Sequence, residues 1–381
     1  MSNFQETFIL KQYTPLIHFQ SSHKGATIRA SELKPKLDRF LIKYAFDNDE
    51  QAYSSYLIKG KEFALDYKVS IIAHNTKVIP EVKNKTYFGN MNKKPYDKDY
   101  RKTVMADMVE VRVFSYHTEL ISYIQKFFSS FLAIENFGTR QSKGFGSFYL
   151  SNEDKHYKPP KQALDDISSC YVYGVYEKLS SLDIFAHVEV IYPLMKSGIN
   201  YPDRYAKAND KNSKASYYRS FLFKYMYEKH SISNEKRFIK ENFFDAKVRI
   251  EPNSHPKRYV RALLGVADGV MFRDDQRRGR INYKHQNIKR FKSPLTFKII
   301  EDTLFIIAHS NTMILDQTFK FTSKEPFISQ NIKTPSDFDI NDFLYSFVDD
   351  FNSLEVKKIK NIFDKKILNA RKARFVKGGE R

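Results

Sequence analysis

The spacing of apolar residues predicts four strands within the first 150 residues. Residues 7–13, 63–74 and 147–150 are apolar runs bounded by polar or proline-containing segments. Residues 108–114 alternate apolar and polar side chains with a period of two, which is typical of a half-buried strand. These four segments are candidates for a single sheet.

Two helices are predicted between these strands. The first begins at Ser31, a residue type suited to cap a helix N-terminus, and the second covers residues 120–132. The buried face of the first helix is marked by apolar residues at Leu33, Leu37, Phe40 and Leu41. The resulting order, β-α-β-β-α-β, is that of a ferredoxin-like (RRM-like) unit with a polar insertion at residues 75–107.

The second half of the chain repeats the mixture of strands and helices. A strand is predicted at residues 171–176, and a hairpin turns at Glu301 and Asp302. A C-terminal helix begins near Asn341 and is expected to continue through Ile367. Further helices are expected at residues 182–195, 217–228 and 234–242. We therefore expect an α+β protein with two ferredoxin-like domains, residues 1–158 and residues 159–381.

The net charge of the chain indicates what kind of partner it binds. The chain has 381 residues, with 64 Lys and Arg against 44 Asp and Glu, and a formal net charge of +20. Such a balance favours a polyanion, either nucleic acid or an acidic membrane surface. No apolar stretch reaches the length of a membrane span and no signal peptide is recognisable, so we expect a cytoplasmic protein that does not bind membranes.

The sequence contains no pattern for a metal, a cofactor or a small-molecule substrate. The single cysteine, Cys170, cannot form an internal disulfide. It is the first residue of an apolar, strand-like run at residues 170–175, so we expect it to be buried. Walker, zinc-binding and serine-hydrolase patterns are absent from the sequence. We therefore expect no cofactor and no metal site.

A glycine-rich basic loop at residues 137–148 is the first candidate binding element. Three of the thirteen glycines lie here, and their backbone can approach a ligand closely. Backbone N–H groups in such a turn can bind phosphate, with Arg and Lys adding charge, although a simple connecting turn is the alternative. The candidate RNA contacts in this loop are Gly138, Arg140, Lys143, Gly144, Phe145 and Gly146.

The second candidate is the polar segment after the first strand. It leads from Thr14 and Pro15 into the first predicted helix, whose N-terminus would attract phosphate. Pairing of Arg29 with Glu32 is the alternative for that arginine. Histidine can act as a general base in RNA cleavage, although a lone loop histidine is far more often structural or idle. The candidates are His18, His23, Lys24, Arg29, Lys34 and Lys36.

The third candidate is the basic segment at residues 257–298, which contains twelve Lys and Arg against three Asp. This bias suits contact with a phosphate backbone, while a charged surface loop is the alternative. The candidates are Arg258, Arg261, Arg277, Arg278, Arg280, Lys289, Arg290 and Lys292. The insertion at residues 75–107 is also basic and aromatic, and either forms an arm or orders on binding.

Three of these stretches resemble one protein superfamily. Thr14-Pro-Leu16, the glycine-rich loop and Arg290-Phe-Lys-Ser-Pro-Leu295 are similar to motifs of the RAMP proteins of CRISPR type III effector complexes. The nearest resemblance is to the large two-domain capping subunit of Cmr-type (III-B) complexes. It implies contacts with guide RNA (crRNA), with target RNA and with other effector subunits.

The resemblance implies a non-catalytic subunit that holds the 3′ region of the guide RNA and helps to admit complementary target RNA in antiviral defence. Related subunits that cut RNA carry an aspartate in the loop after the first strand, whereas residues 16–29 here contain no Asp or Glu. The alternative is a guide-RNA-processing endoribonuclease that uses His18 or His23 as its general base.

Overall fold

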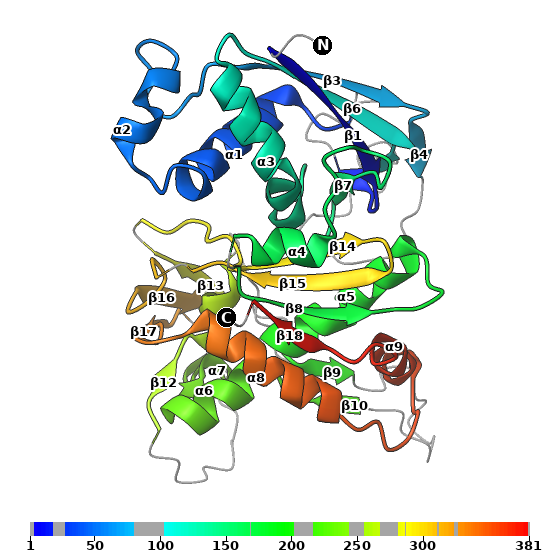
Figure 1. The fold of residues 1–381 in the computed structure, drawn as a ribbon. Helices are drawn as coiled ribbons and strands as arrows, with labels where there is room; N and C mark the ends of the chain where they lie inside the picture. The colour runs from blue at the N-terminus through cyan, green and yellow to red at the C-terminus, as the bar shows by residue number, and fades with distance from the viewer. Residues whose placement is uncertain are drawn as a thin grey trace, which may run out of the picture.

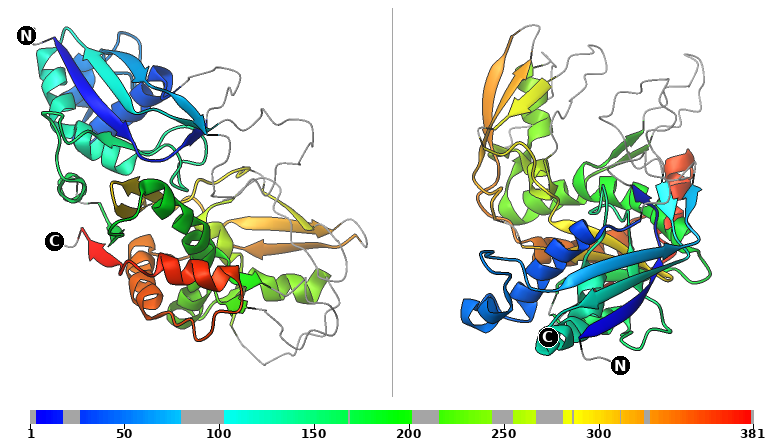
Figure 2. Two further views of the ribbon diagram at one scale, coloured as in Figure 1. Left: turned by 90° about the vertical axis from the view of Figure 1, so that its right-hand side faces the viewer. Right: turned by 90° about the horizontal axis from the view of Figure 1, so that it is seen from above.

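The protein consists of two halves, which lie one above the other in Figure 1 and in the side view of Figure 2. The computed structural model describes residues 4–17, 27–79, 103–167, 169–201, 216–243, 255–266, 281–285, 287–310, 312–323 and 327–379. Each half contains one four-stranded antiparallel sheet.

The sheet of the N-terminal half has the strand order β3-β6-β1-β7. Its strands are β1 (Gln5–Gln12), β3 (Lys68–His74), β6 (Met108–Phe114) and β7 (Phe148–Leu150). Helices α1 (Ala30–Tyr44) and α3 (Thr118–Ile134) contact each other and this sheet. The chain order β1, α1, β3, β6, α3, β7 is the predicted one.

The C-terminal half repeats this arrangement with different elements. The sheet order is β14-β15-β8-β18, so in each sheet the second strand is followed by the third, first and fourth. The elements in chain order are β8 (Tyr171–Val175), α5 (Ser181–Lys196), β14 (Leu295–Ile300), β15 (Thr303–Ala308), α8 (Ile340–Ser353), α9 (Ile362–Ala370) and β18 (Val376–Gly378). The predicted hairpin at Glu301 and Asp302 is confirmed.

Smaller elements surround the two sheets. The insertion predicted at residues 75–107 begins and ends in paired strands, which join β2 in a three-stranded sheet ordered β2-β5-β4. The remaining elements are β2 (Leu16–Ile17), α2 (Glu50–Tyr53), η1 (Ser54–Tyr56), β4 (Lys77–Ile79), β5 (Thr103–Met105), α4 (Pro160–Asp165), β9 (Ile199–Tyr201), β10 (Ser216–Tyr218), α6 (Phe221–His230), β11 (Ser233–Asn234), α7 (Glu235–Phe243), β12 (Lys257–Arg258), η2 (Val260–Leu264), β13 (Ile281–Lys284), β16 (Thr318–Ser323) and β17 (Ser329–Lys333).

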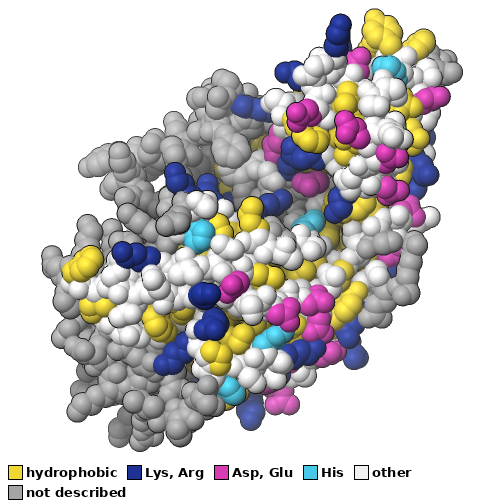
Figure 3. All heavy atoms as spheres, turned by 90° about the vertical axis from the view of Figure 1, so that its left-hand side faces the viewer, with side chains coloured by type: hydrophobic (Ala, Val, Ile, Leu, Met, Phe, Trp, Pro, Cys, Tyr) yellow, Lys and Arg dark blue, Asp and Glu magenta, His cyan; other side chains and the backbone are white. Residues whose placement is uncertain are grey.

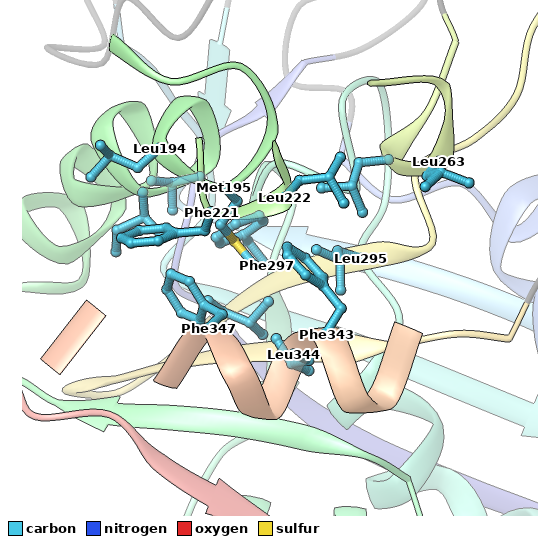
Figure 4. Close-up of a cluster of buried hydrophobic side chains, with 14 of the residues drawn as sticks. Leu194, Met195, Phe221, Leu222, Leu263, Leu295, Phe297, Phe343, Leu344 and Phe347 are labelled. Atoms are coloured by element: carbon cyan, nitrogen blue, oxygen red, sulfur yellow. The ribbon is translucent and has the colours of Figure 1, made fainter. Parts of the chain in front are cut away.

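The C-terminal sheet is buried on both faces. In β15, Leu304 and Ile306 belong to the core of the C-terminal half, whereas Phe305 and Ile307 belong to the core of the N-terminal half. Successive side chains of a strand point to opposite faces, so one strand serves two cores. On the face toward α8, side chains of α5, α6 and β14 meet Phe343, Leu344 and Phe347 (Figure 4).

Several predicted boundaries were wrong. Helix α1 begins at Ala30 with Arg29 at the N-cap position, so Ser31 does not cap it. The second strand begins at Lys68, because Leu57 and Leu65 pair in a separate bridge upstream. The predicted C-terminal helix is two helices, since Leu354 is extended and Asn361 caps α9 through a reciprocal capping box with Asp364. Cys170 is half-buried against the C-terminal core.

Among the described residues, no helix combines the length and the apolar character needed to cross a membrane. That same part of the chain contains no group of three or more His, Cys, Asp or Glu side chains placed to hold a metal ion.

Candidate nucleic-acid interface

A basic pocket lies where the start of α1 meets the glycine-rich loop. Its volume is about 400 Å³. The lining residues are Arg29, Ser31, Glu32, Pro35, Lys36, Arg39, Gly138 and Gln141. Figure 3 shows Lys and Arg side chains on a face of the molecule that is hollowed between the two halves. The pocket therefore joins the first and second sequence candidates in a single place.

Glu32 connects the helix to the loop. The backbone N–H of Gly138 donates to both carboxylate oxygens of Glu32, at 2.9 and 3.1 Å, and Gln141 Nε2 donates to Oε1 at 2.8 Å. Among the described residues that line the pocket, Glu32 is the one acidic group, and its carboxylate is used to hold the loop. Arg29, Lys36 and Arg39 outnumber it, so the pocket has an excess of positive charge.

The helix terminus adds to this charge. Arg29 occupies the N-cap position with extended backbone angles and makes no capping bond through its side chain. The first turn of a helix presents N–H groups and the positive end of the helix dipole. Ser31 is exposed in this first turn, and Arg39 is exposed about two and a half turns further along the helix. A phosphate would meet both arginine charge and a helix N-terminus here.

Lys34 and Lys36 have structural roles that the sequence did not indicate. Lys34 Nζ donates to Asp38 Oδ2 at 2.8 Å and to the Leu65 carbonyl at 2.7 Å, below the Tyr67 ring. Lys36 lines the pocket, but its ammonium is bound by oxygens of Glu135, Asn136 and Gln141. Lys34 therefore holds the helix to the segment before β3, and Lys36 holds it to the loop.

The centre of the glycine-rich loop faces inward. Gly144, Phe145 and Gly146 are buried, and the Phe145 ring lies edge-on to Phe185 with centroids 4.7 Å apart. Ile299 and Phe185 of the C-terminal half cover Gly144 and Phe145, whereas Phe137 and Leu16 of the N-terminal half cover Gly146. The sides that these residues were expected to present to RNA are therefore in contact with the protein itself. Arg140 and Lys143 remain partly exposed.

The loop glycines are required by geometry. Gly144 and Gly146 have backbone φ angles of +83° and +65°, which residues with a Cβ rarely adopt. A Cβ on Gly146 would lie 2.0 Å from the Phe137 carbonyl oxygen, and one on Gly144 would lie 3.0 Å from Ile299 Cδ1. The two glycines therefore allow the loop backbone to pack directly against Ile299 and Phe137.

The third basic segment divides into buried and exposed parts. Lys289, Arg290 and Lys292 are exposed just before β14, as a role in phosphate contact requires. Arg261 instead pairs with Glu235, which is fully buried, so its expected role on an RNA surface is corrected to an internal one. Arg258 is half-buried in β12 and donates to the Lys257 carbonyl at 3.2 Å.

Arg39 lines the pocket but was not among the residues that the sequence indicated. Arg39 follows Glu32 and Lys36 at helical spacing, and this signal could have placed it on the same face. Burial lowers the pKa of His309 to about 4, assisted by the charges of Lys292 and Lys43, which belong to different halves.

Several expected contacts fall outside the described residues. They are His18, His23, Lys24, Arg277, Arg278 and Arg280, together with most of the insertion, residues 80–102.

Two family models match this sequence. The Cmr1 N-terminal domain matches residues 3–199 and the Cmr1 C-terminal domain matches residues 217–369. The chain belongs to the Cmr1 family. Membership makes it a RAMP subunit of Cmr-type, type III CRISPR complexes and confirms the resemblance seen in the three motifs.

The crystal structure of Cmr1 from Pyrococcus furiosus, in its apo form, shares 11% identity over 99% of this chain and 100% of that chain, with a TM-score of 0.46. No curated protein matches the sequence. Assignment to the Cmr1 family therefore rests on the two family models.

Proposed function

We propose that this Cmr1 family chain is a non-catalytic RNA-binding subunit of a cytoplasmic type III CRISPR ribonucleoprotein. It holds the 3′ region of the guide RNA and helps to admit complementary target RNA. The observation that carries this proposal is the pocket beside α1, which is lined by Arg29 at the N-cap of the helix and by Arg39 further along it. Such a site favours a phosphate over a neutral ligand.

The binding mode follows from the kind of groups present. Arginine, lysine and backbone N–H groups contact phosphates, which fix the position of a strand without reading its sequence. Base pairing between guide and target supplies the sequence reading, as it does in other guided effectors. The exposed Lys289, Arg290 and Lys292 of the C-terminal half extend the phosphate contacts beyond the pocket.

We also propose that both halves are ferredoxin-like domains, residues 1–158 and 159–381. The support is the identical spatial order of strands in the two four-stranded sheets. In this arrangement the N-terminal domain supplies the pocket, and the C-terminal domain packs against the inner side of the glycine-rich loop through Phe185 and Ile299.

The test is RNA affinity as a function of salt. Wild-type protein is expected to bind single-stranded RNA with a slope of about 0.7 in log K against log salt for each phosphate contact. Arg39→Gln should lower both affinity and slope. Lys61→Gln removes the same charge from an exposed position outside the pocket and serves as the matched control.

The two variants separate a local site from general attraction. Equal losses in Arg39→Gln and Lys61→Gln would show that net charge alone attracts RNA and would refute the pocket. A flat salt response of the wild type would refute the electrostatic mechanism altogether.

A further inference from the structure

Three exposed residues of α1 form one row along the basic pocket. Ser31, Pro35 and Arg39 all line the pocket, and each is four positions from the next. Residues four positions apart lie on one face of a helix, so the row is about 12 Å long. A ligand in the pocket therefore lies along this face of α1.

Pro35 changes the hydrogen bonding within this row. It lies inside α1 rather than at its start, and proline has no backbone N–H. The Ser31 carbonyl, which would accept from residue 35 in a regular helix, therefore has no such donor. Both residues line the pocket, so a ligand there can reach this carbonyl.

Three polar side chains of the lining are already bound to the protein. Glu32 accepts from the Gly138 N–H and from Gln141, and Gln141 Nε2 also donates to the Gly138 carbonyl at 2.6 Å. Lys36 Nζ donates to Gln141 Oε1 at 2.7 Å and to two further oxygens. The Ser31 carbonyl, by contrast, keeps an acceptor position for a ligand.

The chemistry of a nucleic-acid strand identifies the group that can pair with this carbonyl. The charge of Arg39 favours a phosphate, but a phosphodiester carries only hydrogen-bond acceptors. The donor must therefore come from another part of the nucleotide. In the sugar–phosphate backbone of RNA that donor is the ribose 2′-hydroxyl, and DNA lacks it.

We propose that the Ser31 carbonyl accepts a hydrogen bond from a ribose 2′-hydroxyl of the bound strand, and that Pro35 thereby makes the pocket selective for RNA over DNA. This inference rests on the RNA-binding function proposed above. Arg39 attracts a phosphate of the same strand. A DNA strand supplies that phosphate but leaves the carbonyl without a donor, which lowers its affinity.

The first experiment compares three single-stranded probes of one sequence and length: RNA, DNA and 2′-O-methyl RNA. The full chain should bind RNA roughly two- to tenfold more tightly than either of the others, which is the range for one neutral hydrogen bond. The 2′-O-methyl probe keeps the ribose oxygen but has no hydroxyl proton, so it tests the hydrogen bond itself. Equal affinity for RNA and 2′-O-methyl RNA would overturn the inference.

Pro35→Ala provides the second test. Alanine supplies the missing N–H, so the Ser31 carbonyl is bound within the helix and loses its role toward the ligand. The ratio of RNA to DNA affinity should therefore fall to about one. The melting temperature should rise, because proline is unfavourable in a helix interior. Loss of selectivity in a more stable protein cannot be attributed to unfolding.

Pro193→Ala is the matched control. Pro193 lies inside α5 and does not line the pocket, so its replacement makes the same chemical change in another helix. This variant should keep the wild-type ratio of RNA to DNA affinity. An equal loss of the ratio in both variants would trace selectivity to general helix stability and would overturn the role of Pro35.

The possible outcomes distinguish this inference from the proposed function. RNA binding without preference over DNA, or with a preference that Pro35→Ala retains, would overturn the Ser31 carbonyl as the acceptor and leave the phosphate-binding pocket intact. Absence of RNA binding by the wild type would overturn both.

Discussion

The ring of Phe145 lies 4.7 Å from the ring of Phe185, with an angle of 87° between their planes. Phe145 belongs to the glycine-rich loop of the N-terminal half, and Phe185 belongs to α5 of the C-terminal half. Edge-to-face pairs of this kind stabilise proteins by about 0.5–1.5 kcal/mol beyond the area they bury. The contact makes the loop a structural joint between the two halves.

Truncation of this pair should weaken the joint. Phe145→Ala is expected to destabilise the protein by about 3–5 kcal/mol, since a buried phenylalanine leaves a cavity. A double-mutant cycle with Phe185→Ala, followed by chemical denaturation, should give a coupling of about 1 kcal/mol. Strictly additive effects would mean that the two rings do not stabilise each other.

Gly146 should tolerate no side chain. A Cβ there would lie 2.0 Å from the Phe137 carbonyl oxygen, so Gly146→Ala should cost more than about 4 kcal/mol, the exceptional range for single substitutions. Gly60 has a similar φ of +77° but no atom within 4 Å of a Cβ. Gly60→Ala should therefore lose only the backbone cost of about 1–2 kcal/mol. Similar melting temperatures for the two variants would contradict this steric explanation.

Lys298 should make stability depend on pH. This side chain is fully buried, and its Nζ donates to the carbonyls of Glu135 and Phe148, at 2.7 and 2.8 Å. Burial holds the pKa of Lys298 well below that of a free lysine, although Glu135 partly opposes the shift. Above the folded pKa and below about 10.4, the unfolded chain binds a proton that the folded chain lacks, so stability rises with pH.

Lys298→Met removes this contribution. The variant should be less stable because two buried carbonyls lose their donor, at about 1–3 kcal/mol each. Its free energy of unfolding should also rise less steeply between pH 7 and pH 9.5, by up to about 1.4 kcal/mol per pH unit. Lys61→Met, at an exposed position, should keep the wild-type slope. Identical slopes in wild type and Lys298→Met would disprove the buried-charge argument.

His18→Ala and His23→Ala should leave RNA processing unaltered, because we expect a protein that does not cut RNA. The polar segment that contains these histidines has no acidic residue between positions 16 and 29 to assist them. Labelled repeat RNA incubated with purified protein and resolved on a gel provides the measurement. Discrete cuts that disappear in either variant would support the endoribonuclease alternative.

Much of the architecture could be read from the chain itself. Alternation in β6 and helical spacing in α1 and α3 predict these elements, because local periodicity matches the faces they bury. The start of α1 at Ser31 and the unbroken C-terminal helix were predicted wrongly, because capping depends on backbone geometry that composition alone does not specify. The excess of positive charge indicated a polyanionic partner, and the three motifs indicated a RAMP subunit of Cmr-type complexes.

Only the tertiary structure decided which basic and glycine residues face outward. Gly144 and Phe145 look like ligand contacts in the sequence, but Ile299 and Phe185 from the other half cover them. The sequence suggests that Arg261 is a surface cation, whereas in the structure it forms an ion pair with the buried Glu235. Partners more than twenty residues away set burial and charge pairing, and no local pattern encodes them, whereas the identity of the elements follows from residues three or four positions apart.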